Sequence, residues 1–445
     1  MKAILRSLSF SFCALCFIAS AQRSPSGSDW PNWRGPGRDG VSAEKNLPAS
    51  WAPSGDNLAW RVPYGSRSGP IVLGDHVYLL NSTGKDATLQ ERVQCFHADT
   101  GKLLWEHKFN VYQSDVPPHR IGWSSPAGDL STGNIYALGV GGVLLGLTWE
   151  GKLLWERSLA EDFGLVTTHG GRTVSPVIEG DLVIMSGVTS SWGANARASH
   201  RFMAFDKKTG ETVWVNNPGG RPFDTTYAPP IAATINGTRL LIAGGSDGAL
   251  HAMKPQTGEP VWSYTVSKRG LNTGALFYNN NAIVTHSEEN LDSSEMGLIA
   301  AIDATAKGPL GKQHVKWAFK GFQGGYSSPI LDGDRVLQAD NGANLFAFDV
   351  NTGKELWRQN LGTIQKSSPV LADGKIYVGT ENGKFFILRA RQDKCEILDQ
   401  DLLGTPEQPE PIIASPAVSR GRIYLASMDA LYAIGKKANA PLPYT

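Results

Sequence analysis

One stretch of the chain has the spacing of a catalytic serine. Gly244-Gly245-Ser246-Asp247-Gly248 matches the Gly-x-Ser-x-Gly pattern, in which a serine nucleophile sits on a sharp turn between a strand and a helix of an α/β sheet. Here, however, the segment occupies the same place in an internal repeat as Asp340-Asn341-Gly342 and Glu381-Asn382-Gly383. We therefore predict a hairpin turn at this position and no catalytic residue.

The histidines do not form a recognisable metal site. The nine histidines show neither His-x-x-x-His nor His-Glu-x-x-His spacing, which are the patterns that place two ligands on one helix face. We expect His119, His169 and His200 to lie in solvated loops, and we predict no bound metal.

The cysteines do not form a disulfide scaffold. Cys13 and Cys16 lie in an N-terminal segment that we expect to be removed, which leaves Cys95 and Cys395 in the mature chain. These two belong to units of the repeat that are not neighbours, so we predict two buried thiols.

A further set of residues could bind a ligand. Each stands just before an apolar strand that opens one unit of the repeat, and in a β-propeller these positions converge at one mouth of the central channel. Four cations and three aromatic rings would suit an anionic, sugar-like or carboxylate ligand. The alternative is that they cap strand ends and pair with nearby acids. The set is Arg67, Arg120, Trp123, Arg172, Tyr227, Asn272, Tyr326 and Lys366.

The elements that would position these residues come from the repeat. A typical unit opens with a proline and an apolar strand, continues through a Gly-Asp or Asp-Gly hairpin, and reaches a Thr-Gly turn before its last strand. The opening position recurs eight times, at Pro70, Pro126, Pro176, Pro230, Ala275, Pro329, Pro369 and Pro416. Each unit is predicted to form four short antiparallel strands, which make one propeller blade, so the eight units predict eight blades.

A tryptophan closes most units, and its flat ring with one N–H donor is suited to wedging between blades. The seventh unit lacks one, and the strand around Glu396-Ile397-Leu398 is predicted to substitute. The eighth unit stops one strand short, whereas Leu58–Val62 is an unpaired strand near the N-terminus. We predict that this strand completes the last blade and closes the ring. The tryptophans expected to dock blades are Trp60, Trp105, Trp155, Trp214, Trp262, Trp317 and Trp357.

Two motifs indicate a family. Phe205–Trp214 fits the pattern Ala-x-Asp-x-x-Thr-Gly-x-x-x-Trp apart from its first residue, and Trp30-Pro31-Asn32-Trp33-Arg34-Gly35-Pro36 stands near the N-terminus. The chain thus resembles the bacterial exported pyrroloquinoline-quinone-binding-like β-propeller repeat proteins, which are similar to the propeller lipoprotein of the outer-membrane barrel assembly machinery. The resemblance implies an all-β, eight-bladed propeller with tryptophan docking motifs.

The same resemblance leaves two functions open, because this fold carries both enzymes and adaptors. Quinoprotein dehydrogenases of this type hold the quinone with Ca²⁺ at the propeller axis and press a vicinal disulfide against it. This sequence has no adjacent cysteines and no Cys-x-x-Cys-His haem motif, and we find no match for the family's metal ligands. We therefore favour a non-catalytic scaffold without a cofactor, with a pyrroloquinoline-quinone- and Ca-dependent alcohol or sugar dehydrogenase as the alternative.

The chain ends and charge suggest where the protein works. Lys2 and Arg6, an apolar run and Ala19-Ser20-Ala21 form a signal-peptide pattern, and removing those two cations changes the formal net charge from +1 to −1. We expect an exported, periplasmic or extracellular monomer without nucleic-acid partners or a transmembrane segment, which binds an envelope protein or a small ligand. The expected parts are a signal peptide (1–21), an extension docking on the ring (22–56), the propeller (57–435) and a tail (436–445).

Three long insertions favour a surface role, because loops that exceed the usual hairpin length often carry function. A partner's extended segment could pair with such loops or with a blade edge. The insertions are 81–92, 189–201 and 287–297.

Overall fold

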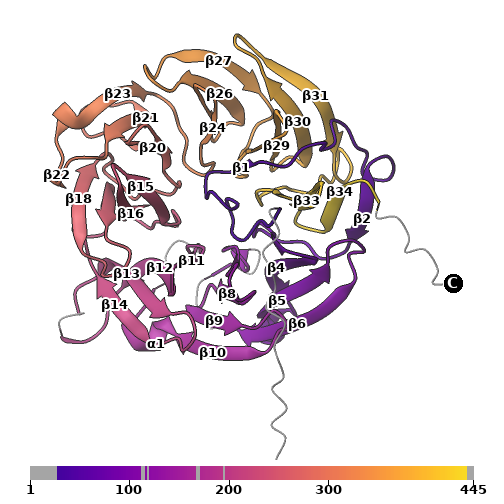
Figure 1. Cartoon of the computed structure of the whole chain (residues 1–445), viewed down its shortest axis with the longest axis horizontal. Helices are drawn as coiled ribbons and strands as arrows, with labels where there is room; N and C mark the ends of the chain where they lie inside the picture. The colour runs from indigo at the N-terminus through magenta and orange to yellow at the C-terminus, as the bar shows by residue number, and fades with distance from the viewer. Residues whose placement is uncertain (1–27, 112–115, 118–119, 167–170, 194–195, 438–445) are drawn as a thin grey trace, which may run out of the picture.

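The computed structural model describes residues 28–111, 116–117, 120–166, 171–193 and 196–437, and it is a closed ring of eight β-sheets (Figure 1). The predicted eight-bladed, all-β propeller is confirmed. The predicted signal peptide, His119, His169 and most of the C-terminal tail lie outside the described residues.

The first four blades run from the N-terminal side of the ring. Blade 1 contains β3 (Ile71–Leu73), β4 (His76–Thr83), β5 (Gln90–His97) and β6 (Leu103–Asn110). Blade 2 contains β7 (Ala127–Gly128), β8 (Ile135–Leu138), β9 (Val143–Leu147) and β10 (Leu153–Ser158). Blade 3 contains β11 (Val177–Glu179), β12 (Leu182–Thr189), β13 (Ser199–Asp206) and β14 (Thr212–Asn216). Blade 4 contains β15 (Ile231–Ile235), β16 (Thr238–Gly244), β17 (Ala249–Met253), β18 (Pro260–Thr265) and the added parallel strand β22 (Gly308–Pro309).

The remaining blades complete the ring. Blade 5 contains β19 (Leu276–Tyr278), β20 (Asn281–Glu289), β21 (Met296–Asp303) and β23 (Val315–Lys320). Blade 6 contains β24 (Ile330–Asp332), β25 (Arg335–Ala339), β26 (Asn344–Asp349) and β27 (Glu355–Asn360). Blade 7 contains β28 (Val370–Ala372), β29 (Lys375–Gly379), β30 (Lys384–Ala390), β31 (Cys395–Leu402) and the parallel strand β1 (Val41–Ser42). Blade 8 contains β32 (Ala417–Ser419), β33 (Arg422–Ala426), β34 (Leu431–Gly435) and β2 (Leu58–Val62). Short helical segments occur at Asp86–Thr88, α1 (Leu159–Phe163) and Lys312–His314.

The N-terminal strand closes the ring as predicted. β2 pairs antiparallel with β34, with Trp60 opposite Ala433 and Val62 opposite Leu431. Blade 8 therefore takes three strands from the C-terminal end of the chain and one from the N-terminal end. This arrangement removes the free edge that a linear row of blades would expose.

Tryptophans lie at the seams between blades, and six of their indole N–H groups donate to a backbone carbonyl of the next blade. At the blade 5–6 seam the Trp317 ring packs against Gly353, which has a φ of 71°, and a Cβ there would lie 2.3 Å from the ring. The Thr-Gly turn thus supplies both a left-handed backbone and room for the tryptophan. The bonds run at 2.9–3.1 Å from Trp60 to Ala98, Trp105 to Trp149, Trp155 to Lys207, Trp214 to Pro255, Trp317 to Val350 and Trp357 to Arg391.

Two seams depart from this pattern. The indole N–H of Trp262 is buried without a hydrogen-bond partner among the described residues. At the blade 7–8 seam, where the repeat has no tryptophan, Trp51 of the N-terminal segment packs edge-on against Phe385 and Tyr432. Trp51 therefore fills this seam together with the predicted strand, because Leu398 of β31 is partly buried against the same cluster, whereas Ile397 is 44% exposed.

The serines before the repeated prolines tie the inner strands together around the channel. Wherever the next blade has a serine at this position, its Oγ accepts a hydrogen bond from the backbone N–H of the preceding blade. The chain of bonds is interrupted where Pro229 or a glycine replaces the serine, because the hydroxyl is missing. The bonds, of 2.8–2.9 Å, run from Gly69 to Ser125, Ser125 to Ser175, Gly274 to Ser328, Ser328 to Ser368 and Ser368 to Ser415.

Residues 28–42, which we call the axial segment, cross the middle of the ring (Figure 1). Trp30 forms a backbone bridge with Val72 of blade 1, and β1 runs parallel to β28 of blade 7. Between them the buried Arg34 guanidinium donates to the carbonyls of Pro329 (2.7 Å) and Pro369 (3.0 Å), which belong to blades 6 and 7. The Trp-x-x-Trp-Arg-Gly-Pro motif thus places an arginine against the proline carbonyls of two inner strands.

Two expectations about side chains are corrected. His200 is not in a solvated loop but in β13, where it pairs opposite Val188 and is buried, because the β12–β13 hairpin is longer than the sequence indicated. Cys95 is buried as predicted, whereas Cys395 is only half-buried because it lies on the outer strand of blade 7.

Candidate ligand-binding funnel

The predicted binding residues belong to one end of the ring. In a blade of four antiparallel strands, the connection between the second and third strands and the connection to the next blade lie at the same end. We call this the loop end, and the opposite end, with the Gly-Asp and Thr-Gly turns, the turn end. The axial segment lies against the turn end, since Arg38 pairs with Glu179 at the end of β11 and Gly74 donates to Asp29.

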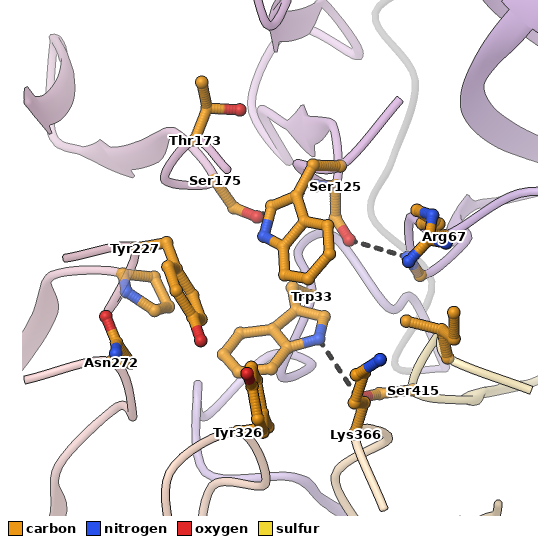
Figure 2. Close-up of a pocket in the computed structure, with 14 residues that line it drawn as sticks. Trp33, Arg67, Ser125, Thr173, Ser175, Tyr227, Asn272, Tyr326, Lys366 and Ser415 are labelled. Carbon is orange, nitrogen blue, oxygen red and sulfur yellow. Dashed lines mark hydrogen bonds between the residues drawn. The ribbon is translucent and has the colours of Figure 1, made fainter. Parts of the chain in front are cut away.

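A hollow of about 70 Å³ lies along the axis at the loop end. In Figure 2 the Trp33 ring lies at its centre, and Trp33 Nε1 donates to Ser415 Oγ at 3.1 Å. Because Trp33 comes from the axial segment, which lies against the turn end, its ring forms the floor of the hollow, which we call the funnel. The other lining residues are Arg67, Gly69, Trp123, Ser125, Thr173, Ser175, Tyr227, Pro229, Asn272, Tyr326, Lys366, Ile413 and Ser415.

Aromatic rings hold the cations in place. The Arg172 guanidinium carbon lies 5.4 Å from the centre of the Trp123 ring, 5.6 Å from Tyr227 and 5.7 Å from Tyr326. The two tyrosine rings are stacked with their centres 6.2 Å apart. Cation–π contacts of this kind position a guanidinium without neutralising its charge.

Positive charge at the mouth is only partly balanced. Burial and the charges of Arg120 and Arg172 lower the pKa of Arg67, while Glu381 acts in the opposite direction. Glu381 already forms an ion pair with Lys366 at 2.6 Å. No carboxylate is among the residues that line the funnel, but Glu381 lies close enough to act on Arg67, and Glu288 and Asp224 lie close enough to act on Tyr227.

Three buried polar atoms around the funnel lack a hydrogen-bond partner among the described residues. They are Arg172 Nε, Thr173 Oγ1 and Asn272 Oδ1. Buried polar groups in native proteins are nearly always paired, with protein, water or a ligand. These atoms are themselves inaccessible to solvent, so they lie behind the surface of the funnel.

Sequence reasoning located most of these residues. Arg67, Trp123, Tyr227, Asn272, Tyr326 and Lys366 line the funnel, and Arg172 contacts three of its rings. Arg120 does not line it but is close enough to affect the pKa of Arg67. That these residues bind a ligand stays a prediction.

Trp33 as the floor of the funnel and the serines as its inner wall were not predicted from the sequence. The sequence did offer a sign of the serine wall, because serine recurs immediately before the proline that opens a unit. A residue at this position in each blade must face the axis of the propeller.

The Gly-x-Ser-x-Gly segment lies in the turn between β16 and β17, as predicted. Ser246 is fully buried, and its Oγ has no partner in the described part of the chain. The nearby His200 Nδ1 accepts from the Ser246 backbone N–H at 3.3 Å rather than from the hydroxyl. Without access to solvent or a base on Oγ, this serine is not an activated nucleophile.

The funnel does not fit a Ca²⁺-assisted quinone. Ca²⁺ takes six to eight oxygen ligands, including carboxylates, whereas the lining offers hydroxyls and the Asn272 amide. Within the described residues no group of three His, Cys, Asp or Glu side chains is arranged to hold a metal. We therefore derive no redox step for this site.

Comparisons with known proteins agree with the fold. The sequence model of the family described as outer membrane protein assembly factor BamB matches residues 89–291, 295–394 and 341–438. The outer membrane protein assembly factor BamB of Burkholderia pseudomallei (strain K96243) is 27% identical over 350 residues, covering 78% of this chain and 79% of that protein. Quinoprotein ethanol dehydrogenase of Pseudomonas putida is 25% identical, covering 53% of this chain and 37% of that protein.

Solved structures share the fold at lower identity. BamB from Moraxella catarrhalis is 18% identical with a TM-score of 0.59, and the match covers 85% of this chain and 99% of that one. Quinohemoprotein alcohol dehydrogenase from Comamonas testosteroni is 15% identical with a TM-score of 0.66, covering 96% and 83%. Among the described residues, no helix has the length and apolar character needed to span a membrane.

Proposed function

Because the chain belongs to the family described as outer membrane protein assembly factor BamB, we propose that it is an exported, non-catalytic propeller that binds proteins of the outer-membrane assembly apparatus. The observation that carries this proposal is the extent of the family match, which runs from residue 89 to residue 438 and so spans nearly the whole ring. The chemistry of the axis supports the same conclusion, since the funnel lacks a carboxylate base or a metal-binding set among its lining residues.

The loop end is the surface that we assign to the protein partner. The three insertions noted in the sequence all connect the second and third strands of a blade, although they are shorter than expected because β4, β5, β12, β13 and β20 extend into them. Large apolar side chains are exposed at this end: Trp192 is 91% exposed and Phe223 is 61% exposed. Exposed aromatic residues on long loops are typical of protein-binding surfaces.

The test is a binding measurement with the purified barrel assembly protein of the same organism, immobilised in detergent. We expect the unmodified propeller to bind, and the double variant Trp192→Ser/Phe223→Ser to bind at least about tenfold more weakly. The matched control is Leu104→Ser/Val213→Ser, which changes two residues that are 41% and 50% exposed where outer strands begin, at the turn end. Absence of binding by the unmodified protein, or an equal loss in both double variants, would contradict the proposal.

The quinoprotein dehydrogenase remains the second candidate because of the similarity to quinoprotein ethanol dehydrogenase. Its test is incubation of the purified chain with pyrroloquinoline quinone and Ca²⁺, followed by absorbance and dye-reduction measurements with alcohols and sugars. Stoichiometric quinone uptake with dye reduction would favour the enzyme over the adaptor.

A further inference from the structure

The seam between blades 4 and 5 departs from the repeat pattern and contains a groove. In blade 6 the connection before the outer strand is the tight turn 350–354, whereas in blade 5 it runs over 304–314. This longer connection includes β22, which pairs with the outer edge of β18 in blade 4 (Figure 1). Beside it lies a hollow of about 240 Å³, lined by β18 on one side and by β21 and β23 on the other. We call this hollow the blade 4–5 groove.

Most of the groove wall is apolar. Val266, which follows β18, and Leu298 and Ala300 of β21 line it, and all three are at most 7% exposed. They belong to one hydrophobic cluster of this seam, so the groove reaches down to the core between the blades. A wall of this kind suits an alkyl chain, because burial of apolar surface is favourable and needs no directional partner. The other apolar residues that line the groove are Leu291, Val315 and Ala318.

Two lysines and one aspartate form the polar part of the groove. The ammonium groups of Lys320 and Lys312 lie 2.8 and 3.0 Å from the two carboxylate oxygens of Asp292. Burial raises the pKa of Tyr264, and the charges of Lys312 and Asp292 also act on it, so its phenol lies in the same part of the groove. The three charged side chains are 34–83% exposed, so a ligand can reach them. Two ammonium groups that share one carboxylate favour a second anion.

We infer that the blade 4–5 groove binds a medium-chain fatty acid, with the alkyl chain against the apolar walls and the carboxylate beside the two lysines. A methylene group needs roughly the 30 Å³ that a water molecule occupies in the liquid, so 240 Å³ corresponds to about eight groups. Octanoate therefore matches the groove in both length and charge. The inference goes beyond the proposed function and does not depend on it, because its test uses the propeller alone.

An extended peptide fits the same groove less well. A peptide that adds to a sheet needs a row of unpaired backbone groups on an edge strand. Here β22 already pairs with β18 at Trp262 and Ser263, in the middle of that strand. The end of a peptide chain, with an apolar side chain beside a carboxylate, is the form of protein ligand that the experiment has to exclude.

The experiment compares four probes by isothermal titration calorimetry with the purified propeller at low ionic strength, where charge interactions are weakly screened. Octanoate carries the chain and the negative charge, butyrate a shorter chain, octylammonium the opposite charge, and N-acetylleucine represents the end of a peptide. We expect octanoate to bind at least about tenfold more tightly than butyrate, because each buried methylene group contributes roughly fourfold in affinity. It should bind at least about fivefold more tightly than octylammonium, whose charge the lysines repel.

A substitution that fills the groove locates the alkyl chain. Ala318 is exposed on β23, so Ala318→Phe occupies the groove without enlarging a core residue, and it should weaken octanoate binding at least about tenfold. The matched control is Val215→Phe, because Val215 follows the docking Trp214 on β14 as Ala318 follows Trp317 on β23. This control should leave octanoate binding unchanged.

A second substitution locates the carboxylate. Lys312→Gln/Lys320→Gln should abolish the preference for octanoate over octylammonium, whereas Lys102→Gln/Lys152→Gln, which removes the same charge from turns of blades 1 and 2, should preserve it. The inference is overturned if octanoate gives no saturable heat up to about 5 mM. It is also overturned if butyrate, octylammonium or N-acetylleucine binds as tightly as octanoate, or if either groove variant behaves like its control.

Discussion

Replacing Arg34 by methionine should destabilise the whole ring by about 3 kcal/mol. The Arg34 side chain is 3% exposed, and its guanidinium donates to the carbonyls of Pro329, Pro369 and Asp39 at 2.7, 3.0 and 3.0 Å. Hydrogen bonds from a charged donor contribute roughly 1.5–3 kcal/mol each. Methionine has a similar length but no donor, so these carbonyls would lose their partner inside the channel.

The cost of burying the charge reduces this loss. Burial lowers the pKa of Arg34 from 12.5 to about 10, and a shift of this size corresponds to roughly 3 kcal/mol against the charged form. The gain from three bonds exceeds that cost by roughly 1.5–6 kcal/mol, which brackets the expected loss. Arg34→Lys keeps the charge but concentrates its donors on one nitrogen, so it should retain only part of the stability.

The assay is urea unfolding followed by circular dichroism and tryptophan fluorescence, combined with limited proteolysis. We expect Arg34→Met to lower the unfolding midpoint more than Arg34→Lys, and to expose the axial segment to cleavage before the blades unfold. If Arg34→Met unfolds within about 0.5 kcal/mol of the unmodified protein, the arginine does not anchor the axial segment and the reasoning is refuted.

Three further predictions concern the ring. Burial raises the pKa of Glu91 from 4.5 to about 7, although two backbone N–H groups donate to it. The folded state therefore binds the carboxyl proton of Glu91 more tightly than the unfolded state does, so the free energy of unfolding should fall by roughly 3 kcal/mol as the pH rises from about 4.5 to 7. The Glu91→Gln variant should flatten the dependence of the urea midpoint on pH. An unchanged dependence would exclude Glu91 as the cause of the loss of stability. Trp317→Phe removes an indole hydrogen bond, whereas the Trp262 indole has no such bond to lose among the described residues. In thermal unfolding, Trp317→Phe should therefore reduce the stability by about 1 kcal/mol more than Trp262→Phe does. Equal losses in the two variants would count against a stabilising role of the indole hydrogen bond between blades. Ser368→Ala leaves a buried backbone N–H unpaired and should cost about 1–3 kcal/mol, whereas Ser419→Ala, whose Oγ has no partner among the described residues, should be nearly neutral in the same measurement.

The blades could be predicted from the sequence because each one repeats a similar short sequence pattern. The proline, which recurs in seven of the eight units, the hairpin glycine and the Thr-Gly turn each favour a particular backbone conformation, and their recurrence makes the units easy to recognise. Closure of the ring was predictable for the same reason, since blade 8 lacked one strand and Leu58–Val62 had no other partner.

The parts that the sequence did not reveal depend on contacts between distant segments. Trp51 fills the blade 7–8 seam from almost 350 residues away, and nothing in the seventh unit indicates it; its backbone N–H donates to Asp399, 348 positions along the chain. The hydrogen bonds from Arg34 to the carbonyls of two inner strands likewise join residues that are far apart in the sequence. Position in the repeat identified the funnel walls, but the floor comes from a segment outside the repeat.

The funnel and the proposed protein-binding surface share one end of the ring. The axial segment occupies the turn end, where Trp33 closes the hollow, whereas the exposed Trp192 and Phe223 lie at the loop end. A protein that covers the loop end would therefore also cover the mouth of the funnel.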